Sequence, residues 1–277
     1  MAPGTRDRMA GVVAGRLRPH ASAAAAGNPR ARELRATGIS HFGPLLSDAQ
    51  AGELQRYFLG KPVHDPYRDA SRRFLPDSAE RHPDSHIAHH DALDIIRAPH
   101  LFGLANRPDI LAVAADFLGC KPTLGYLASW WSYPTRLGAQ QAEHFHRDVD
   151  DWRFVKLFVY LTDVAADNGP HIYVSRSASS PALRRIRRYD DAEVVQAFGR
   201  DNVLELTARA GEGFMEDTFG MHKGQPVASG RRLIFQAVYS MFALPYGPKS
   251  AVARIDEVRL PDGSRPDPWI NRLYLSR

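Results

Sequence analysis

From about residue 122 onward, the chain is a succession of short apolar runs separated by turn residues, a pattern that strongly limits the possible folds. The runs are rich in β-branched and aromatic residues, which favour strands: "TLGYLASWWSY", "RFVKLFVYLTDV", "PHIYVS", "NVLELTAR", "EGFMEDTF", "RRLIFQAVYSMFAL" and "SAVARIDEVRL". Many short strands in succession favour an antiparallel sandwich or barrel over alternating βαβ units. We therefore predict a mainly β fold with flanking helices and a jelly-roll core.

Helices are predicted before these strands and in one insertion between them. Ser47 is placed to cap a helix through "DAQAGELQRYFLG", which ends at Gly60. Another helix covers "RPDILAVAADFLG", with Pro108 in its first turn and Gly119 after its end. The charged insertion "ALRRIRRYDDAEVVQAFGRD" is predicted to form an exposed helix between strands.

The N-terminal segment, residues 1–38, differs in composition from the rest of the chain. It is rich in Ala, Arg, Gly and Pro, with "ASAAAAGNPRA" at its centre, which predicts a flexible leader. An organelle transit peptide has a similar composition, rich in Arg and poor in acids, so that interpretation stays open. Residues 39–277 are long enough to bury one core, and we predict a single domain there, with helices on its N-terminal side.

The excess positive charge is concentrated in the leader. Residues 1–37 hold seven arginines against two acids, which accounts for the whole formal net charge of +5. The remainder lacks a Lys/Arg block long enough to follow a phosphate backbone, so no nucleic-acid partner is predicted. The single cysteine, Cys120, excludes an intramolecular disulfide, and no stretch is apolar enough to span a membrane. These features predict a cytoplasmic protein with no membrane association.

His146 and Asp148 form an H-x-D pair just before the run "RFVKLFVYLTDV". Alternate residues of an extended chain point to the same side, so both side chains can bind one ion. His222 closes a later strand-like segment, "EGFMEDTFGMH". Two histidines and one carboxylate make the facial triad of non-haem Fe(II) oxygenases, which leaves positions open for a cosubstrate and O₂. The alternative is a solvated charged loop that also contains Asp150 and Asp151.

Lys156 stands in the middle of the apolar run, where a buried ammonium costs several kcal/mol unless an anion meets it. Arg232, or its neighbour Arg231, opens the apolar strand "LIFQAVYS" shortly after His222. A dicarboxylate that chelates a metal at one end and meets an arginine at the other supplies the missing negative charge, since guanidinium binds carboxylate through two parallel hydrogen bonds. In the alternative interpretation, the two arginines lie at a solvated strand end.

As a set, these motifs resemble those of the phytanoyl-CoA dioxygenase family of Fe(II)- and 2-oxoglutarate-dependent oxygenases. The resemblance covers roughly residues 37–250 and is clearest in "FHRDVDDWRFVKLFVYLTDVAADNGPHIYVSRS" and "GEGFMEDTFGMHKGQPVASGRRLIFQAVYS". It implies a double-stranded β-helix fold in which His146, Asp148 and His222 bind iron. It also implies 2-oxoglutarate and O₂ as cosubstrates.

The same resemblance assigns further residues. The arginine that binds 2-oxoglutarate falls on Arg232, or on Arg231 if the match of this strand is shifted by one. Lys156 occupies a position where the related ectoine hydroxylases place a serine that touches 2-oxoglutarate, which implies a cosubstrate contact. Trp152, just after the H-x-D pair, and Trp131 are expected to line the substrate pocket. The family often has a "GSH" motif after "NGP", whereas this chain reads "VSRSAS", a departure that concerns substrate binding rather than iron binding.

The implied reaction is oxidative decarboxylation of 2-oxoglutarate to succinate and CO₂, coupled to hydroxylation of an unactivated C–H bond in a small metabolite. The protein's part is mainly placement, because the metal supplies the oxidant. The main alternative is a non-catalytic, cupin-like metal-binding jelly roll, which has no need of Lys156 and Arg232. Acids near the metal, namely Glu143, Asp150 and Asp151, would favour a cationic substrate.

Other motifs suggest rival sites. In "RHPDSHIAHHDALD", His86 and His90 are spaced to bind zinc on a helix, but no glutamate adjoins His86, so the hydrolytic motif is incomplete. We favour a surface segment or the lip of the substrate pocket for this cluster. "HRDVDDWRF" is similar to a kinase catalytic loop, but Arg153 stands where asparagine is required, so a kinase is excluded.

Overall fold

Two antiparallel β-sheets form the body of the protein in the computed structural model, which describes residues 3–17 and 27–277. The large sheet contains, in spatial order, β1 (Ile39–Pro44), β8 (Glu212–Glu216), β5 (Phe154–Tyr160), β10 (Arg232–Ser240), β4 (Thr123–Ser132), β3 (Ile87–His90) and β2 (Val63–His64). The small sheet consists of β7 (Val203–Leu206), β6 (His171–Val174) and β9 (His222–Gly224). The prediction of a mainly β fold with a jelly-roll core is confirmed.

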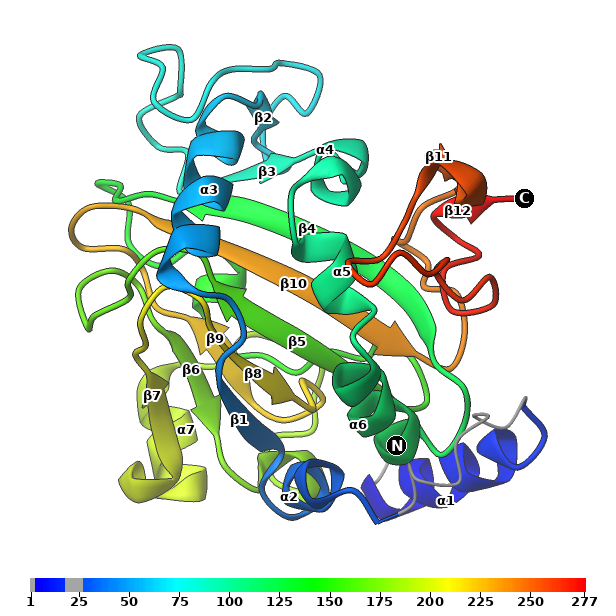
Figure 1. The fold of residues 1–277 in the computed structure, drawn as a ribbon. Helices are drawn as coiled ribbons and strands as arrows, with labels where there is room; N and C mark the ends of the chain where they lie inside the picture. The colour runs from blue at the N-terminus through cyan, green and yellow to red at the C-terminus, as the bar shows by residue number, and fades with distance from the viewer. Residues whose placement is uncertain (1–2, 18–26) are drawn as a thin grey trace.

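The long strands β4, β10 and β5 lie side by side at the centre of the large sheet (Figure 1). Because side chains alternate across a strand, β10 has two different faces. Leu233 and Phe235 pack in the core formed with the helices, whereas Ile234 packs with Phe158 and Tyr173 in the core between the two sheets. The inner face of the large sheet is therefore the one that can contribute side chains to a site between the sheets.

Helices cover the outer face of the large sheet (Figure 1). They are α3 (Asp48–Leu59), α4 (Ala92–Arg97), α5 (Leu101–Ala105) and α6 (Pro108–Leu118). Ser47 caps α3 by accepting a hydrogen bond from the backbone N–H of Gln50, and Gly60 ends this helix. Pro108 lies in the first turn of α6, and Gly119 follows its end with a φ of 78°, in the left-handed region. Both predicted helices are confirmed.

The predicted flexible leader, residues 1–38, contains two helices, α1 (Pro3–Ala14) and α2 (Pro29–Thr37). Asn28 caps α2, and Leu34 and Ala10 are fully buried in the main core. These helices depart from the predicted flexible leader, because Ala10 and Ala14 in α1 and Ala31 and Leu34 in α2 pack against the protein. Residues 18–26 of the predicted leader lie outside the described residues.

Two other sequence predictions are only partly correct. The charged insertion forms a helix in its second half alone, α7 (Asp191–Phe198), where Asp190 caps the first turn and Val194 is buried. The run at residues 250–260 forms only a short strand, β11 (Ala253–Arg254), which pairs in parallel with β12 (Leu275–Ser276). The rest of this run is too exposed and charged to join a sheet.

None of the helices in the described part of the chain has the length and apolar character needed to cross a membrane.

Candidate metal centre

A cavity of about 240 Å³ lies between the sheets and contains the predicted metal ligands. Its walls combine polar groups with aromatic and apolar side chains from the inner face of the large sheet. They include Tyr67, His86, His89, Tyr126, Trp130, Ser132, Glu143, His146, Asp148, Lys156, Phe158, His171, His222, Arg232, Ile234 and Gln236. An apolar cavity with a few convergent polar groups is the usual form of a small-molecule site.

Backbone pairing brings the H-x-D pair and the distant His222 together. The N–H of His146 donates to the carbonyl of His222 at 2.9 Å, and the N–H of His222 donates back at 3.0 Å. The N–H of Asp148 donates to the carbonyl of Thr218 at 2.9 Å. One ligand atom from each of the three side chains lies within 4.8 Å of the others. The structure thus gathers the predicted triad of His146, Asp148 and His222 at one point.

Both histidines are oriented for metal binding by their Nδ1 atoms. Nδ1 of His146 lies 2.9 Å from the carbonyl of His144, and Nδ1 of His222 lies 3.0 Å from that of Gly220. Since a carbonyl only accepts, each Nδ1 carries a proton, and in the neutral ring this leaves the lone pair on Nε2 for a metal. Burial lowers the pKa of His146 to about 2, so this ring is neutral. For His222, burial is outweighed by the Asp148 carboxylate, which raises its pKa.

Lys156 meets two carboxylates of the protein itself. Its Nζ donates to Oδ2 of Asp148 at 2.7 Å and lies 2.9 Å from Oδ2 of Asp150, the second contact being an ion pair without hydrogen-bond alignment. Burial alone would lower the pKa of Lys156, but the two carboxylates raise it. Burial would likewise raise the pKa of Asp148, but Lys156 and His222 hold it well below its usual range. These two carboxylates supply the anions that Lys156 needs, so its burial does not by itself require a bound dicarboxylate.

Arg232 and Arg231 have different surroundings. Arg232 is buried on the inner face of the large sheet, where Nη2 donates to Oγ of Ser132 at 3.0 Å and Nε has no hydrogen-bond partner. Among the described residues, no carboxylate lies within ion-pair distance of Arg232, and burial lowers its pKa. Arg231 instead pairs with Asp77 and lies 4.7 Å from the ring centre of Trp131. Arg232 is thus a buried cation in the cavity wall whose guanidinium meets no carboxylate of the described residues.

A buried pair beside the triad, His171 and Glu216, was missed by the sequence analysis. His171 stacks on His222 with ring centres 5.5 Å apart, and its Nε2 lies 2.8 Å from Oε2 of Glu216. Burial lowers the pKa of His171 well below its usual value and raises that of Glu216 to about 8. Neither Nε2 of His171 nor either carboxyl oxygen of Glu216 has an aligned hydrogen-bond partner among the described residues, and the raised pKa favours the protonated form of Glu216.

We expect the Glu216→Gln variant to change how stability depends on pH. A carboxyl with a pKa of 4.5 in the unfolded chain and about 8 in the folded protein stabilises the fold fully below pH 4.5. This contribution is lost as the pH rises towards 8. Chemical denaturation of the metal-free proteins at several pH values should show the variant gaining stability relative to the wild type over this range. A constant difference would contradict a protonated Glu216.

The tryptophan predictions need correction. Trp131 is fully buried in the core under the helices, and it is the adjacent Trp130 that lines the cavity, where it stacks on His89. The prediction was displaced by one residue, which on a strand means the opposite face. Trp152 packs against the main core and lines a separate surface pocket with Arg6, away from the triad.

The two tryptophans predict contrasting variants. We expect Trp131→Ala to lower the free energy of unfolding by about 3–5 kcal/mol, because it leaves a large cavity in the core. Trp130→Ala removes a side chain that is already partly exposed, so its cost should stay below about 2 kcal/mol. Chemical denaturation of both variants measures the difference. A larger loss for Trp130→Ala would reverse our assignment of the two faces.

The histidine cluster at residues 82–90 does not form a zinc site on a helix. Residues 87–90 form strand β3, so His86 and His90 are not on one helical face. His86 and His89 line the cavity, whereas His90 packs against Phe58 in the outer core. His86 and His89 therefore lie where the alternative interpretation placed the cluster, at the cavity, and a role in substrate binding stays a prediction.

The acids expected to favour a cationic substrate are largely occupied. Asp150 is paired with Lys156, and Asp151 accepts hydrogen bonds at 2.8 Å from the backbone N–H groups of Met241 and Phe242. Only Glu143 of this group lines the cavity. The structure therefore gives little reason to expect a cationic substrate.

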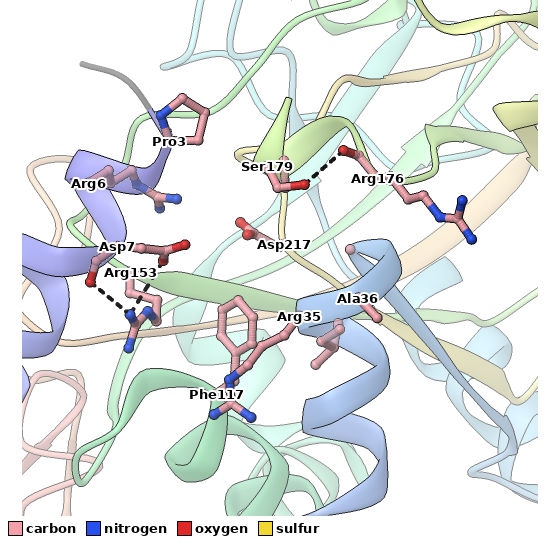
Figure 2. Close-up of a pocket in the computed structure, with 13 residues that line it drawn as sticks. Pro3, Arg6, Asp7, Arg35, Ala36, Phe117, Arg153, Arg176, Ser179 and Asp217 are labelled. Carbon is pink, nitrogen blue, oxygen red and sulfur yellow. Dashed lines mark hydrogen bonds and ion pairs between the residues drawn. The ribbon is translucent and has the colours of Figure 1, made fainter. Parts of the chain in front are cut away.

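A separate cavity is lined by residues of α1 and α2 and by Asp217 (Figure 2). Figure 2 shows Arg153 held to Asp7 and the side chain of Arg6 directed towards this cavity. Arg6 lies 3.9 Å from the ring centre of Phe219 and bonds weakly, at 3.5 Å, to the carbonyl of Asp151. The lining contains no histidine, so this cavity is not the metal centre. Near this cavity, α1 packs against the segment that carries His222, through the contact of Arg6 with Phe219.

No protein-family model matches this sequence, and no curated protein matches it. Several solved structures are similar to it in fold. The epimerase SnoN in complex with Fe³⁺, alpha ketoglutarate and nogalamycin RO is 17% identical, with a TM-score of 0.56 over 76% of this chain and 81% of that chain. HygX from Streptomyces hygroscopicus with nickel, 2-oxoglutarate and hygromycin B bound is 13% identical, with a TM-score of 0.55 over 87% and 97%.

The non-heme alpha ketoglutarate dependent carbocyclase SnoK from nogalamycin biosynthesis is 17% identical, with a TM-score of 0.54 over 80% of this chain and 86% of that chain. At these identities the likeness establishes a shared jelly-roll fold. It does not test the narrower resemblance to the phytanoyl-CoA dioxygenase family, which stays a prediction.

Proposed function

We propose that this protein is an Fe(II)- and 2-oxoglutarate-dependent oxygenase that acts on a small molecule, with hydroxylation of an unactivated C–H bond as the expected outcome. One observation carries the proposal: a two-histidine, one-carboxylate triad lies in the same cavity as a buried arginine that lacks an anion. The triad alone fits any metal-binding jelly roll. The unpaired Arg232 adds the group that a bound dicarboxylate would meet.

The residues of the triad fit Fe(II). His146, Asp148 and His222 converge at one point, with both Nε2 atoms near the ionised Asp148 carboxylate. This donor set is the one found in non-haem Fe(II) oxygenases, which keep other coordination positions open. When bound with its cosubstrate, such a metal supplies the oxidant for C–H oxidation.

Arg232 would hold the distal carboxylate of 2-oxoglutarate. Its guanidinium lies in the cavity wall and is anchored by Ser132 on the neighbouring strand, in direct register. The neighbouring apolar residues Phe158 and Ile234 shield this end of the cavity from water, which strengthens a charged hydrogen bond. We assign the carboxylate contact to Arg232 rather than to Arg231, since Arg231 is already paired with Asp77.

The side of the cavity formed by β3 and β4, next to β10, would receive the substrate. Aromatic rings line it in two parallel stacks, Tyr67 with His86 and His89 with Trp130. Burial lowers the pKa of His89 to about 4 and also lowers that of His86, so both imidazoles are neutral near pH 7. These surfaces suit ring faces of a neutral small molecule. Trp130 thus replaces Trp131 and Trp152 as the proposed pocket residue.

The solved structures support this proposal. SnoN was crystallised with Fe³⁺, alpha ketoglutarate and nogalamycin RO, and HygX with nickel, 2-oxoglutarate and hygromycin B. The same comparison includes an epimerase and a carbocyclase, so the fold serves reactions other than hydroxylation.

Succinate release is the test of the catalytic function. The purified protein with Fe(II), ascorbate, O₂ and 2-oxoglutarate should release succinate when a panel of ring-bearing small molecules includes a substrate, and the Arg232→Met variant should not. If metal and 2-oxoglutarate bind but no compound in a broad panel, nor the protein alone, yields succinate, the alternative of a non-catalytic metal-binding jelly roll is favoured.

A further inference from the structure

Lys156 lies beside the proposed metal centre, and both of its ion-pair partners are carboxylates of the protein itself. It is buried, with 7% of its surface exposed, and it projects from the middle of β5, the strand between β8 and β10. Among the residues that the structure describes, no other lysine and no arginine forms an ion pair with the proposed ligand Asp148. Its other partner, Asp150, follows Asp148 by two residues.

The three side chains form a closed charge cluster. The Lys156 ammonium donates to Oδ2 of Asp148, whereas Oδ1 of Asp148 accepts no hydrogen bond from a described residue. One cation between two carboxylates leaves a single net negative charge at a site proposed to receive a divalent cation. Without a metal, two neighbouring and largely buried carboxylates, with side chains 19% and 13% exposed, destabilise a protein unless a cation compensates them.

We propose that Lys156 is the internal counter-cation of the metal centre: it compensates Asp148 and Asp150 when no metal is bound, and it lowers the affinity of the triad for metal. This inference rests on the proposed metal centre. Lys156 is accordingly a positioning residue that acts through Asp148 and holds its Oδ2 atom, which leaves Oδ1 free. Lys156 thereby keeps the metal-free site folded. It also competes with an incoming metal ion for the negative charge of Asp148.

The cluster allows a test in which two single variants shift metal affinity in opposite directions. Lys156→Met removes the positive charge with little change in side-chain length. The negative charges of Asp148 and Asp150 then act on the metal without compensation. Asp150→Asn removes one negative charge and leaves Lys156 to Asp148 alone. The double variant Lys156→Met/Asp150→Asn restores the net charge of the wild type. A role in packing alone would lower metal affinity in both single variants.

The experiment is a calorimetric titration of each metal-free protein with Co²⁺ in the absence of 2-oxoglutarate. We expect Lys156→Met to bind Co²⁺ about tenfold more tightly than the wild type or better, and Asp150→Asn about tenfold more weakly, since a unit charge this close shifts the binding of a divalent ion by that order. The double variant should return to within about threefold of the wild type. Weaker binding by Lys156→Met, or shifts of both single variants in the same direction, would overturn the proposal.

Thermal unfolding of the same proteins provides the second measurement. Metal-free Lys156→Met should unfold at a temperature roughly 5–10 °C lower than the metal-free wild type. Saturating Co²⁺ should raise the unfolding temperature of this variant by more than it raises that of the wild type. Lys121→Met is the matched control, because Lys121 forms a comparable ion pair with Asp267, which is not part of the triad cavity. This control should leave Co²⁺ affinity unchanged.

Failure of the metal centre and failure of this inference can be told apart. If the wild type binds no Co²⁺, the proposed function loses its basis. The unfolding temperatures of the metal-free proteins then still test the role of Lys156. A lower unfolding temperature in Lys156→Met that is partly restored in the double variant supports the counter-cation role. Equal stability of all variants overturns it. If Lys156→Met alone does not fold, the double variant and Asp150→Asn decide the question through their Co²⁺ affinities.

Discussion

Replacing His222 by alanine is expected to lower the affinity for Fe(II) by more than about 100-fold. His222 is fixed from both sides, by backbone hydrogen bonds to His146 and by the contact of its Nδ1 atom with the carbonyl of Gly220. Alanine removes the Nε2 donor while the backbone ladder can persist, so the effect is on the metal and not on the fold. We expect the same result for His146→Ala. Anaerobic calorimetry with Fe(II) measures the loss.

His86→Ala is the matched control for these ligand variants. His86 lines the same cavity and is nearly as buried as His222, but it lies outside the triad. Its Fe(II) affinity should equal that of the wild type. Undiminished Fe(II) affinity in His222→Ala, or an equal loss in His86→Ala, would contradict the assignment of the metal ligands.

Replacing Arg232 by methionine is expected to weaken 2-oxoglutarate binding by about two orders of magnitude while Fe(II) affinity is retained, because a buried charged hydrogen-bond partner is lost. The proposed carboxylate contact is the one that would satisfy the unpaired Nε of this guanidinium. Isothermal titration of the iron-loaded protein with 2-oxoglutarate under anaerobic conditions gives both affinities.

The same variant has a second expected effect, on stability. A buried cation without an ion pair is costly, so the metal-free Arg232→Met protein should be at least as stable as the wild type when no 2-oxoglutarate is present. Arg231→Met is the control, since this residue is half-exposed and paired with Asp77. If Arg231→Met rather than Arg232→Met loses 2-oxoglutarate, the cosubstrate lies on the other face of the strand.

The fold and the metal triad could be predicted from the sequence because both depend on local patterns. Short β-rich runs separated by turns specify strands, and the H-x-D pair places two ligands on one side of an extended segment. The later histidine, His222, could be linked to His146 and Asp148 because a resemblance to a known family supplied the pairing. The structure provides its physical basis, which is a reciprocal pair of backbone hydrogen bonds between His146 and His222.

The face of a central strand could not be predicted in the same way. Eight of the ten residues of β4 are buried and the other two are half-buried, because one side of the strand packs on helices and the other faces the cavity. With both faces apolar, hydrophobic alternation gives no register, and Trp130 and Trp131 look equivalent in the sequence. The sequence could not decide between Arg231 and Arg232 at the start of β10 for the same reason. In the structure, Arg231 pairs with Asp77, whereas Arg232 is bonded to Ser132 in the cavity wall.

Long-range electrostatic partners were equally inaccessible to sequence reasoning. The sequence shows that Lys156 is surrounded by apolar residues, but not that the loop after Asp148 turns Asp150 back to it. His171 and Glu216 lie on strands of different sheets and meet only when the sheets face each other. Helix α2 was mistaken for part of a flexible leader because its two buried residues, Ala31 and Leu34, form too small an apolar face to stand out.

The most direct test of the central claim is an anaerobic visible spectrum of the metal-free protein titrated with Fe(II) and then with 2-oxoglutarate. The account predicts a weak charge-transfer band that develops only when both are present, disappears in His146→Ala, and requires much more 2-oxoglutarate in Arg232→Met. Absence of the band in a protein that binds Fe(II) would contradict a keto acid bound at this metal. It would favour instead a metal-binding jelly roll in which Arg232 has another partner.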